Sequence, residues 1–391
     1  MFKKSLAAVA LLGAFAGSAF AADVTLYGVV DEGFLYTHKD TDVADSDAVD
    51  KLELKSGIQA GSRWGLKGTE DLGNGLKVGF ILESGFNADD GTQSVSGTMF
   101  NREASLNVMG PFGQLSLGKI GAITQGTSSW GKVGAVSAFG TSYGAANVAN
   151  ATNVFAATVG VMDNTIAYQT PKFAGFTVYA QYSMGNSKAG TASTPTQVEN
   201  KSSTDRYYAL GATYANGPVN LYFSVDSVNY ASYFDNTTPP STQDMDDSLT
   251  VAFGGSYDFS VVKVFAGAQY FDEVDASTIG GLKSGVGLST NTGKLEGYAL
   301  QASVSAPLAG GTGYFGVGYL DASEADSVAA ADGVDVKYYV TSVGYKYDLS
   351  KRTNVYSVLS YAKGDRDWAA AGKEDTKPST VGFGIGLRHN F

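Results

Sequence analysis

Large apolar side chains alternate with small or polar ones at the end of the chain, over residues 379–391. From position 381 onward the odd-numbered and the even-numbered positions differ. The odd-numbered residues are Val381, Phe383, Ile385, Leu387, His389 and Phe391, and the even-numbered ones are Gly382, Gly384, Gly386, Arg388 and Asn390. A period of two predicts a β-strand, because successive side chains of a strand point to opposite faces. One face suits hydrocarbon and the other suits water, which is the pattern of a strand in a transmembrane barrel.

The same alternation occurs in an earlier hairpin. Trp64 and Leu66 are expected to face outward and Arg63 and Lys67 inward, before a short polar turn at residues 70–75. The returning segment alternates in the same way. Its outward residues are expected to be Val78, Phe80 and Leu82, and its inward residues Lys77, Gly79, Ile81 and Glu83. Two alternating segments joined by a short turn predict an antiparallel hairpin.

Short turns and long polar connections alternate along the rest of the chain. Further short turns are expected at 110–113, 171–175, 216–218, 258–260, 307–311 and 348–351. The long connections, rich in Asp, Ser, Thr, Asn and Gly, are 39–55, 87–100, 186–205, 231–247, 272–294, 321–335 and 365–378. This asymmetry is that of periplasmic turns and external loops, and the number of segments predicts an all-β, antiparallel transmembrane barrel of about 16 strands.

The beginning of the chain has a different character. Lys3 and Lys4 precede an apolar run that ends at Ala19-Phe20-Ala21, which predicts a cleaved secretory signal peptide at residues 1–21 and a single barrel domain at 22–391. Removal of residues 1–21 with their two lysines leaves a chain with a formal charge of 25 − 38 = −13. No later segment is apolar for the ~18 residues that a membrane helix needs. The acidic total argues against nucleic acid as a partner.

One long connection differs from the others. Residues 120–160 are mostly Gly, Ala, Ser, Thr and Asn, with no Asp or Glu, and they include Trp130, Phe139 and Tyr143. An uncharged loop with scattered aromatic residues is expected to pack against other parts of the protein. We predict that it folds into the lumen, with these three rings as its packing residues. An ordinary external flap is the alternative.

Several separated motifs then carry a resemblance to a known family. They are residues 61–76 (Gly-Ser-Arg-Trp-Gly-Leu-Lys-Gly-Thr-Glu-Asp-Leu-Gly-Asn-Gly-Leu), 101–104, 112–115, 347–353 and the terminal Phe391. Together they resemble the general diffusion porins of Gram-negative bacteria, betaproteobacterial type. The resemblance implies a homotrimer of 16-stranded barrels in the outer membrane, each with its third external loop folded inward. It also implies that Phe391 is the signal read by the barrel-assembly machinery, and that lipid, lipopolysaccharide and small hydrophilic solutes are the other partners.

The resemblance further implies a basic cluster on the wall that faces the folded loop. Arg63 and Arg102 stand at matching positions, although Arg102 shares its parity with Ala104 and Leu106 and needs either the opposite face assignment or a bulge to point inward. Where the family often has another basic residue, this chain has Ala167.

The charges around the folded loop indicate which ions the channel favours. The candidate constriction residues are Arg63, Lys67, Lys77, Arg102, Lys119 and Lys132, against Glu83 as the inward acid. A narrow site lined with positive charge concentrates anions. The acidic external loops act in the opposite sense, but charges around a wide mouth are screened more strongly. We therefore expect a porin for passive diffusion with a weak to moderate anion preference.

Other functions have less support in the sequence. The chain has two histidines, His38 and His389, no cysteine, and none of the common hydrolase, nucleotide or zinc motifs, so we expect no enzyme activity, no cofactor and no metal site. A porin selective for sugars or organic acids is one alternative, and the inward Tyr179, Tyr207 and Tyr222 would be its stacking residues. A non-conducting structural or adhesive outer-membrane protein is the other.

Overall fold

A computed structural model gives the fold of most of the chain. It describes residues 24–391 except 127, 186–198, 201–203, 232, 236–240, 244–245, 286–293, 326–332, 370–371 and 373. The expected signal peptide, residues 1–21, lies outside the described residues. No helix in the described ranges is both long and apolar enough to cross a membrane.

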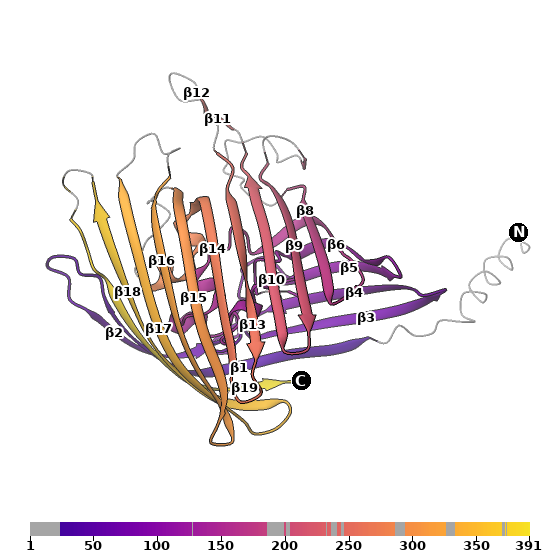
Figure 1. The fold of residues 1–391 in the computed structure, drawn as a ribbon, viewed down its shortest axis with the longest axis horizontal. Coiled ribbons are helices and arrows are strands. Elements are labelled where there is room, and N and C mark those ends of the chain that lie inside the picture. Colours follow the sequence, from indigo (N-terminus) through magenta and orange to yellow (C-terminus); the bar gives the residue numbers. More distant parts are fainter. Residues whose placement is uncertain are drawn as a thin grey trace, which may run out of the picture.

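The regular secondary structure of the described chain is almost entirely strand (Figure 1). The strands are β1 (Thr25–Asp40), β2 (Val49–Ser56), β3 (Arg63–Gly73), β4 (Leu76–Gly85), β5 (Glu103–Gly110), β6 (Gly113–Gly121), β7 (Val161–Gln169), β8 (Phe176–Ser183), β9 (Arg206–Asn216), β10 (Val219–Asn229), β11 (Tyr233–Asp235), β12 (Ser241–Gln243), β13 (Leu249–Asp258), β14 (Lys263–Asp275), β15 (Lys294–Leu308), β16 (Gly311–Glu324), β17 (Val334–Asp348), β18 (Thr353–Trp368) and β19 (Ser379–Asn390). The short helices are η1 (Val133–Val136), η2 (Gly144–Ala146), α2 (Ala151–Val154), η3 (Ala276–Thr278) and η4 (Gly281–Gly285).

The strands close into a barrel, as predicted. All of them except the β11–β12 hairpin join one antiparallel sheet, in which β19 pairs with β1 from Asp40↔Ser379 to Val29↔Asn390. On its other side β1 pairs with β2 over residues 32–39 and with β3 over residues 25–29, so β2 and β3 share one position in the wall. The barrel therefore has 16 strand positions. Closure leaves no strand edge to be satisfied in lipid.

The wall shows the alternation that the sequence predicted. Along β17, Val336, Tyr338 and Val340 are buried toward the interior, whereas Tyr339 and Val343 are about half exposed on the outer face. In the last strand Phe383 and Leu387 are likewise exposed, and Arg388 faces the lumen. The outer face is thus apolar along its strands, which suits contact with lipid.

The two ends of the barrel differ, and here part of the prediction is wrong. The short turns lie where expected, but most of the expected connection 39–55 is strand, because β1 runs to Asp40 and β2 starts at Val49. Strands β14, β16 and β18 also continue into segments that were expected to be loops. The extensions of β14, β16 and β18 are mostly polar and lack the apolar alternation that marks a strand, whereas in β2 Leu52 and Leu54 alternate with Lys51 and Glu53 and this signal was missed.

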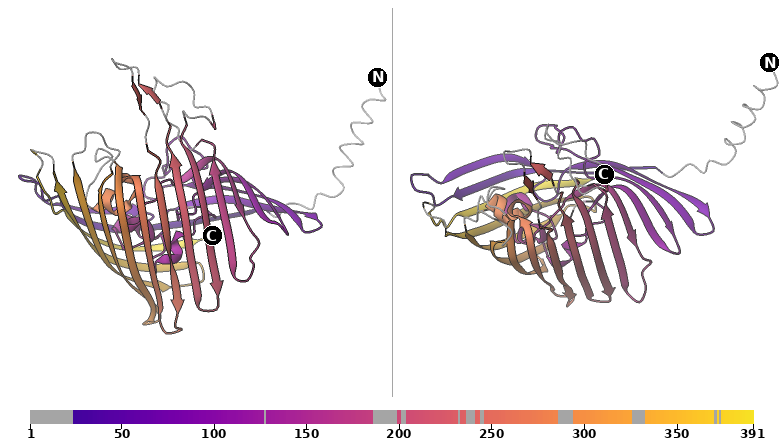
Figure 2. Two further views of the ribbon diagram at one scale, coloured as in Figure 1. Left: turned by 45° about the horizontal axis from the view of Figure 1, so that its top comes forward. Right: turned by 90° about the horizontal axis from the view of Figure 1, so that it is seen from above.

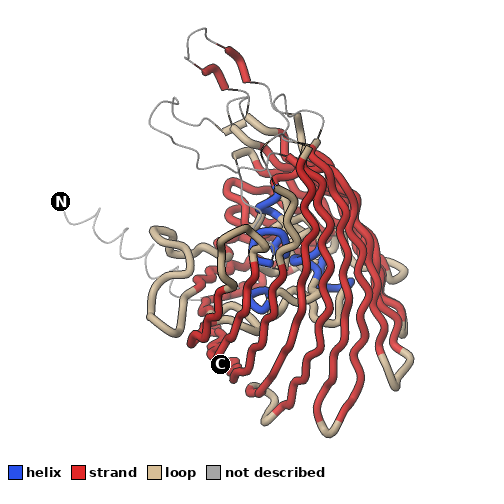
Figure 3. Tube along the Cα trace, turned by 90° about the vertical axis from the view of Figure 1, so that its left-hand side faces the viewer, coloured by secondary structure: helices blue, strands red, loops and turns tan. Residues whose placement is uncertain are grey.

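The described residues 122–126 and 128–160, named here the inner loop, lie inside the barrel with η1, η2 and α2 (Figures 2 and 3). Val136, Val154 and Phe155 are buried against inward residues of β13–β18. Glycines in the wall provide the space, since a Cβ atom at Gly316 or Gly344 would lie 3.0 or 3.1 Å from the ring of Phe139. The described part of the loop therefore packs against the inner face of the wall.

Candidate functional site

Both ends of the inner loop are tied to one buried carboxylate. Asp226 of β10 accepts hydrogen bonds on Oδ2 from Thr124 (3.0 Å) and Thr158 (3.1 Å), which lie near the beginning and the end of the loop. It also accepts hydrogen bonds from Tyr207 (2.8 Å) and from Thr250. Four hydroxyl donors satisfy a charge that has been removed from water. This cluster fixes where the loop leaves and rejoins the wall.

Amide side chains of the wall hold the loop backbone at two further places. Gln269 of β14 accepts from the N–H of Ala156 at 2.6 Å and donates to the carbonyl of the same residue at 2.9 Å. Gln181 of β8 accepts from Ile123 N at 2.9 Å and donates to the carbonyl of Gly121 at 3.0 Å. These bonds supply the hydrogen-bond partners that backbone groups outside helices and strands would otherwise lack.

The middle of the loop is fixed against the segment between β2 and β3. Gln59 donates to the Tyr143 hydroxyl at 2.8 Å and its carbonyl accepts from Tyr143 N at 3.1 Å. Asp31 of β1 in turn accepts from Ala60 N and from the Tyr356 hydroxyl, both at 2.5 Å. The loop is thereby anchored across the lumen, from β10 and β14 to β1.

A cavity of about 530 Å³ remains between the inner loop and the wall. Its lining is contributed by β1, β3, β4, β5 and β19 on one side and by the loop on the other: Tyr27, Gln59, Ala60, Gly61, Arg63, Lys67, Ile81, Glu83, Arg102, Glu103, Gln125, Gly126, Ser128, Ser129, Thr141, Ser142, Thr152 and Arg388. The loop side carries no charge. The wall side carries four basic residues and two acidic ones.

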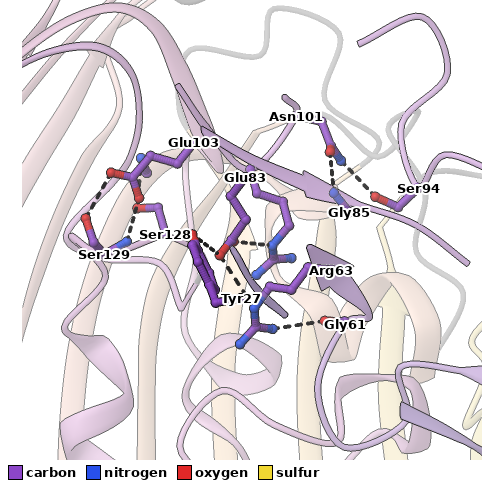
Figure 4. Close-up of polar contacts among 12 residues, drawn as sticks. Tyr27, Gly61, Arg63, Glu83, Gly85, Ser94, Asn101, Glu103, Ser128 and Ser129 are labelled. Carbon is purple, nitrogen blue, oxygen red and sulfur yellow. Dashed lines mark hydrogen bonds and ion pairs between the residues drawn. The ribbon is translucent and has the colours of Figure 1, made fainter. Parts of the chain in front are cut away.

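Glu83 is the centre of the polar contacts in this cavity (Figure 4). Its carboxylate accepts from Arg102 Nε at 2.7 Å and from the Tyr27 hydroxyl at 3.0 Å, and it lies 3.7 Å from Arg63 Nε. Arg63 also donates to the carbonyl of Gly61 at 2.9 Å. One carboxylate therefore balances only one of two guanidinium charges.

The second acid of the cavity, Glu103, is directed to the inner loop. It accepts from Ser129 N at 2.9 Å, Ser129 Oγ at 3.0 Å and Ser105 Oγ at 2.9 Å, and its side chain is almost fully buried. Its charge faces hydroxyl and amide donors, and among the described residues no cation binds it directly. It thus serves as a further anchor for the loop.

The other two basic residues have no carboxylate partner among the described residues. Lys67 lies over the ring of Tyr27, with Nζ 5.1 Å from the centroid. Arg388 donates to Asn390 Oδ1 at 3.2 and 3.3 Å. Both charges therefore remain available to ions in the lumen.

The structure brings only some of the predicted residues together. Arg63, Lys67, Glu83 and Arg102 line the cavity. Arg102 precedes β5, so the parity of that strand does not govern it, and its backbone N–H bonds the carbonyl of Glu83 at 3.2 Å.

The remaining three predicted lysines, Lys77, Lys119 and Lys132, do not line this cavity. Lys77 pairs with Asp71 at 3.8 Å near the turn at the opposite end of β4. Lys119 is held by Asp163 at 2.6 Å. Lys132 donates to the carbonyl of Ser129 within the inner loop, where burial lowers the pKa of its ammonium group.

The predicted packing residues of the loop are all buried. Trp130 meets the edge of Tyr179 with ring centroids 6.3 Å apart, and Phe139 contacts Tyr143 and Tyr314 at 6.1 and 5.6 Å. Ala167 is buried in the same cluster as Trp130.

The inward tyrosines do not form a stacking surface. Tyr179, Tyr207 and Tyr222 are buried beneath the inner loop, with at most 7% of their surface exposed. Within the described residues, no group of three or more His, Cys, Asp or Glu side chains is placed to hold a metal ion.

Arg388 and Glu103 were not predicted as site residues, although the inward parity of each position indicated it. Arg388 has the inward parity of the last strand, and Glu103 shares its parity with Ser105 and Asn107. Asp31 and Asp226 were missed because nothing in the sequence shows what an isolated inward carboxylate will bind.

Comparison with known proteins agrees with this architecture. The chain matches the family model described as Gram-negative porin over residues 7–367. It is 34% identical to an outer membrane porin protein of Bordetella pertussis and 30% identical to outer membrane porin protein 32 of Delftia acidovorans, in each case over the full length of both chains. Among solved structures it resembles an anion-selective porin from Comamonas acidovorans, with 26% identity, a TM-score of 0.65, and 95% of this chain and 100% of that chain covered. The chain therefore belongs to the Gram-negative porin family and is an outer-membrane porin, a channel for the passive diffusion of ions and small hydrophilic solutes.

Proposed function

We propose that the cavity lined by Arg63, Lys67, Arg102 and Arg388 is the constriction of this porin and that it favours small anions. The observation that carries the proposal is the charge of its lining, four basic residues against two acidic ones, opposite a loop without any Asp or Glu. Charge of one sign in a narrow aqueous passage raises the local concentration of the opposite ion.

The size of the effect follows from the separation of charges. A single positive charge about 7 Å from a chloride ion in water stabilises it by about 0.6 kcal/mol, which is roughly a threefold increase in concentration. Glu83 offsets one of these charges, and the buried Glu103 offsets part of another. Two excess charges support a moderate preference and not an exclusive one.

The acidic residues at the long-loop end oppose this preference only weakly. Asp42, Asp45 and Asp47 lie on the exposed connection between β1 and β2. Exposed charges act over a Debye length of about 8 Å at physiological salt. The solved relative from Comamonas acidovorans is described as anion-selective, which supports the same preference here.

The test is the zero-current potential of single channels across a planar bilayer that separates two KCl concentrations. We expect the sign that corresponds to chloride being more permeable than potassium. A potential of the opposite sign would refute the proposal and leave the porin assignment intact.

Organic acids fit the proposed constriction better than neutral sugars. The lining offers guanidinium and ammonium groups, whereas the three inward tyrosines that could stack with sugars are buried. Passage of either class requires no catalytic group.

We also propose the assembly that the family resemblance implied. Residues 1–21 are removed on export, residues 22–391 form the barrel domain, and three copies associate in the outer membrane. Phe391 is the assembly signal for the barrel-assembly machinery, and the acidic loops meet lipopolysaccharide. An unheated denaturing gel of purified protein with and without cross-linking tests the trimer.

A further inference from the structure

A second cavity, of about 630 Å³, lies at the short-turn end of the barrel. It is bounded by the inner loop at Ala138, Phe139, Ser142 and Tyr143, and by the turn between β17 and β18. Gln59 and Arg388 line both this cavity and the proposed constriction. The two cavities therefore adjoin at these residues.

The second cavity has a larger excess of positive charge than the first. Lys346, Lys351, Arg352 and Arg388 line it, and Asp348 is the one acidic residue of its lining. Asp348 is paired with Lys346 at 3.2 Å. Among the described residues the side chains of Lys351 and Arg352 have no hydrogen-bond or ion-pair partner, and the partner of Arg388 is the neutral Asn390. Three charges are thus uncompensated.

The turn that carries two of these charges is held in place by several backbone bonds. Ser350 Oγ accepts from the N–H groups of Arg352 and Thr353, both at 3.1 Å. The carbonyl of Arg352 accepts from Asn390 N at 2.8 Å, and the N–H of Leu349 bonds Thr353 O at 2.9 Å. Less conformational entropy is then lost when a ligand binds, because the backbone of the turn is already ordered.

An unsatisfied acceptor lies in the same cavity. Asn354 is 93% buried and lines the cavity, and its Oδ1 atom has no hydrogen-bond partner among the described residues. A buried amide oxygen without a partner is destabilising unless a water molecule or a ligand donates to it. A hydroxyl group, or a water molecule carried by an anion, would satisfy it.

We propose that this cavity is a binding site for small polyvalent carboxylate anions on the periplasmic side of the constriction. The inference rests on the proposed anion preference and specifies the solute class. Two guanidinium groups offer paired N–H donors that match carboxylate oxygens, and Lys351 adds a third charge. A monovalent anion gains only a fraction of this attraction, because the Coulomb energy scales with the charge of the ligand.

The experiment is the block of single-channel chloride current by citrate, added to one side of the bilayer at constant chloride. Citrate added on the side that the short turns face is expected to reduce the current. Citrate added at the same concentration on the long-loop side should have little effect. The double variant Lys351→Gln/Arg352→Gln should weaken that sided block at least about threefold for each charge removed. Block from the other side should be unchanged.

A matched control comes from another short turn. Lys172 lies in the turn between β7 and β8 and is not part of the lining of either cavity, so Lys172→Gln should keep the full sided block. The KCl zero-current potential of the double variant should stay on the anion side, which also shows that the variant is folded and conducting.

Two results separate this inference from the proposed function. Equal block from both sides, or a sided block that the double variant retains, would overturn the second site while the anion preference stands. Cation selectivity of the unmodified channel in KCl alone would instead refute the anion preference itself.

Discussion

At the scale of single residues, the balance around Glu83 determines the charge of the proposed constriction. One carboxylate is shared by Arg102 at 2.7 Å and Arg63 at 3.7 Å, so removal of either arginine leaves a compensated pair, and removal of Glu83 leaves two free cations. The side chains of both arginines are about one-fifth exposed and therefore keep contact with water. Their electrostatic effect on a permeating ion is therefore modest and depends on salt.

Arg63→Gln is expected to lower the ratio of chloride to potassium permeability by up to about ninefold at low salt, since one positive charge raises the local chloride concentration about threefold and lowers that of potassium about threefold. The zero-current potential in a KCl gradient measures this ratio. The matched control is Lys77→Gln, because Lys77 is paired with Asp71 at the far end of β4. An equal shift in both variants would show that the height of a charge along the barrel does not matter, contrary to our account.

The face of residues in the clearly alternating strands could be predicted from the sequence, but their height along the barrel could not. Arg63, Lys67, Lys77 and Glu83 were all assigned inward by parity. Lys77 and Glu83 are six positions apart on β4, which at about 3.3 Å per residue is a separation of roughly 20 Å. Height depends on strand register, which is set by pairing between strands and not by the pattern within one strand.

At the scale of elements, the inner loop is held by side chains of the wall that bond its backbone. Gln269 is the clearest case, because its amide makes both bonds to Ala156. Loss of these bonds leaves two buried backbone groups without partners. The composition of the loop predicted that it would be packed, but the contacts that fix it come from inward polar residues whose partners only the fold reveals.

Gln269→Ala should loosen the end of the inner loop and increase the open-channel current noise and the frequency of brief closures, with little change in the yield of folded protein. Single-channel recording at constant voltage measures both quantities. The control is Gln301→Ala on the neighbouring strand β15, since the Gln301 amide is also buried but bonds no described residue. Equal noise in the two variants would mean that the two bonds do not restrain the loop.

The closing strand is the element that the sequence predicted best, and it shows how the ends of the chain meet. Phe391 and Gly28 exchange backbone hydrogen bonds at 3.1 Å in both directions. A Cβ atom at Gly28 would lie 2.3 Å from the Phe391 ring, so only glycine leaves room for the ring there. The terminal aromatic therefore packs over the first strand.

Phe391→Ala is expected to reduce the amount of barrel in the outer-membrane fraction several-fold, because the ring contact at Gly28 and the proposed assembly signal are both lost. Membrane fractionation with gels of heated and unheated samples measures the folded amount. Phe383→Ala removes an aromatic ring from the same strand at a half-exposed position of the outer wall and should assemble nearly normally. Similar yields from the two variants would contradict a special role for the terminal residue.

At the scale of the whole molecule, alternation and closure explain why so much of the fold was predictable. Each wall strand must present apolar side chains to lipid and bond both of its neighbours, so both requirements leave a mark on the sequence. Parts that project beyond the membrane face no such requirement. The polar extensions of β14, β16 and β18 beyond the expected strand limits were missed for this reason.

The central claim is that ions cross through the cavity lined by Arg63, Lys67, Arg102 and Arg388 and that its positive charge sets the selectivity. Its most direct test is the zero-current potential of the native channel beside that of the triple variant Arg63→Gln/Arg102→Gln/Arg388→Gln in the same KCl gradient. Our account predicts an anion-selective native channel and a triple variant with a clearly smaller anion preference or a reversal to cations, because Lys67 is then the one basic residue left beside Glu83 and Glu103. Identical potentials for the two channels would contradict it.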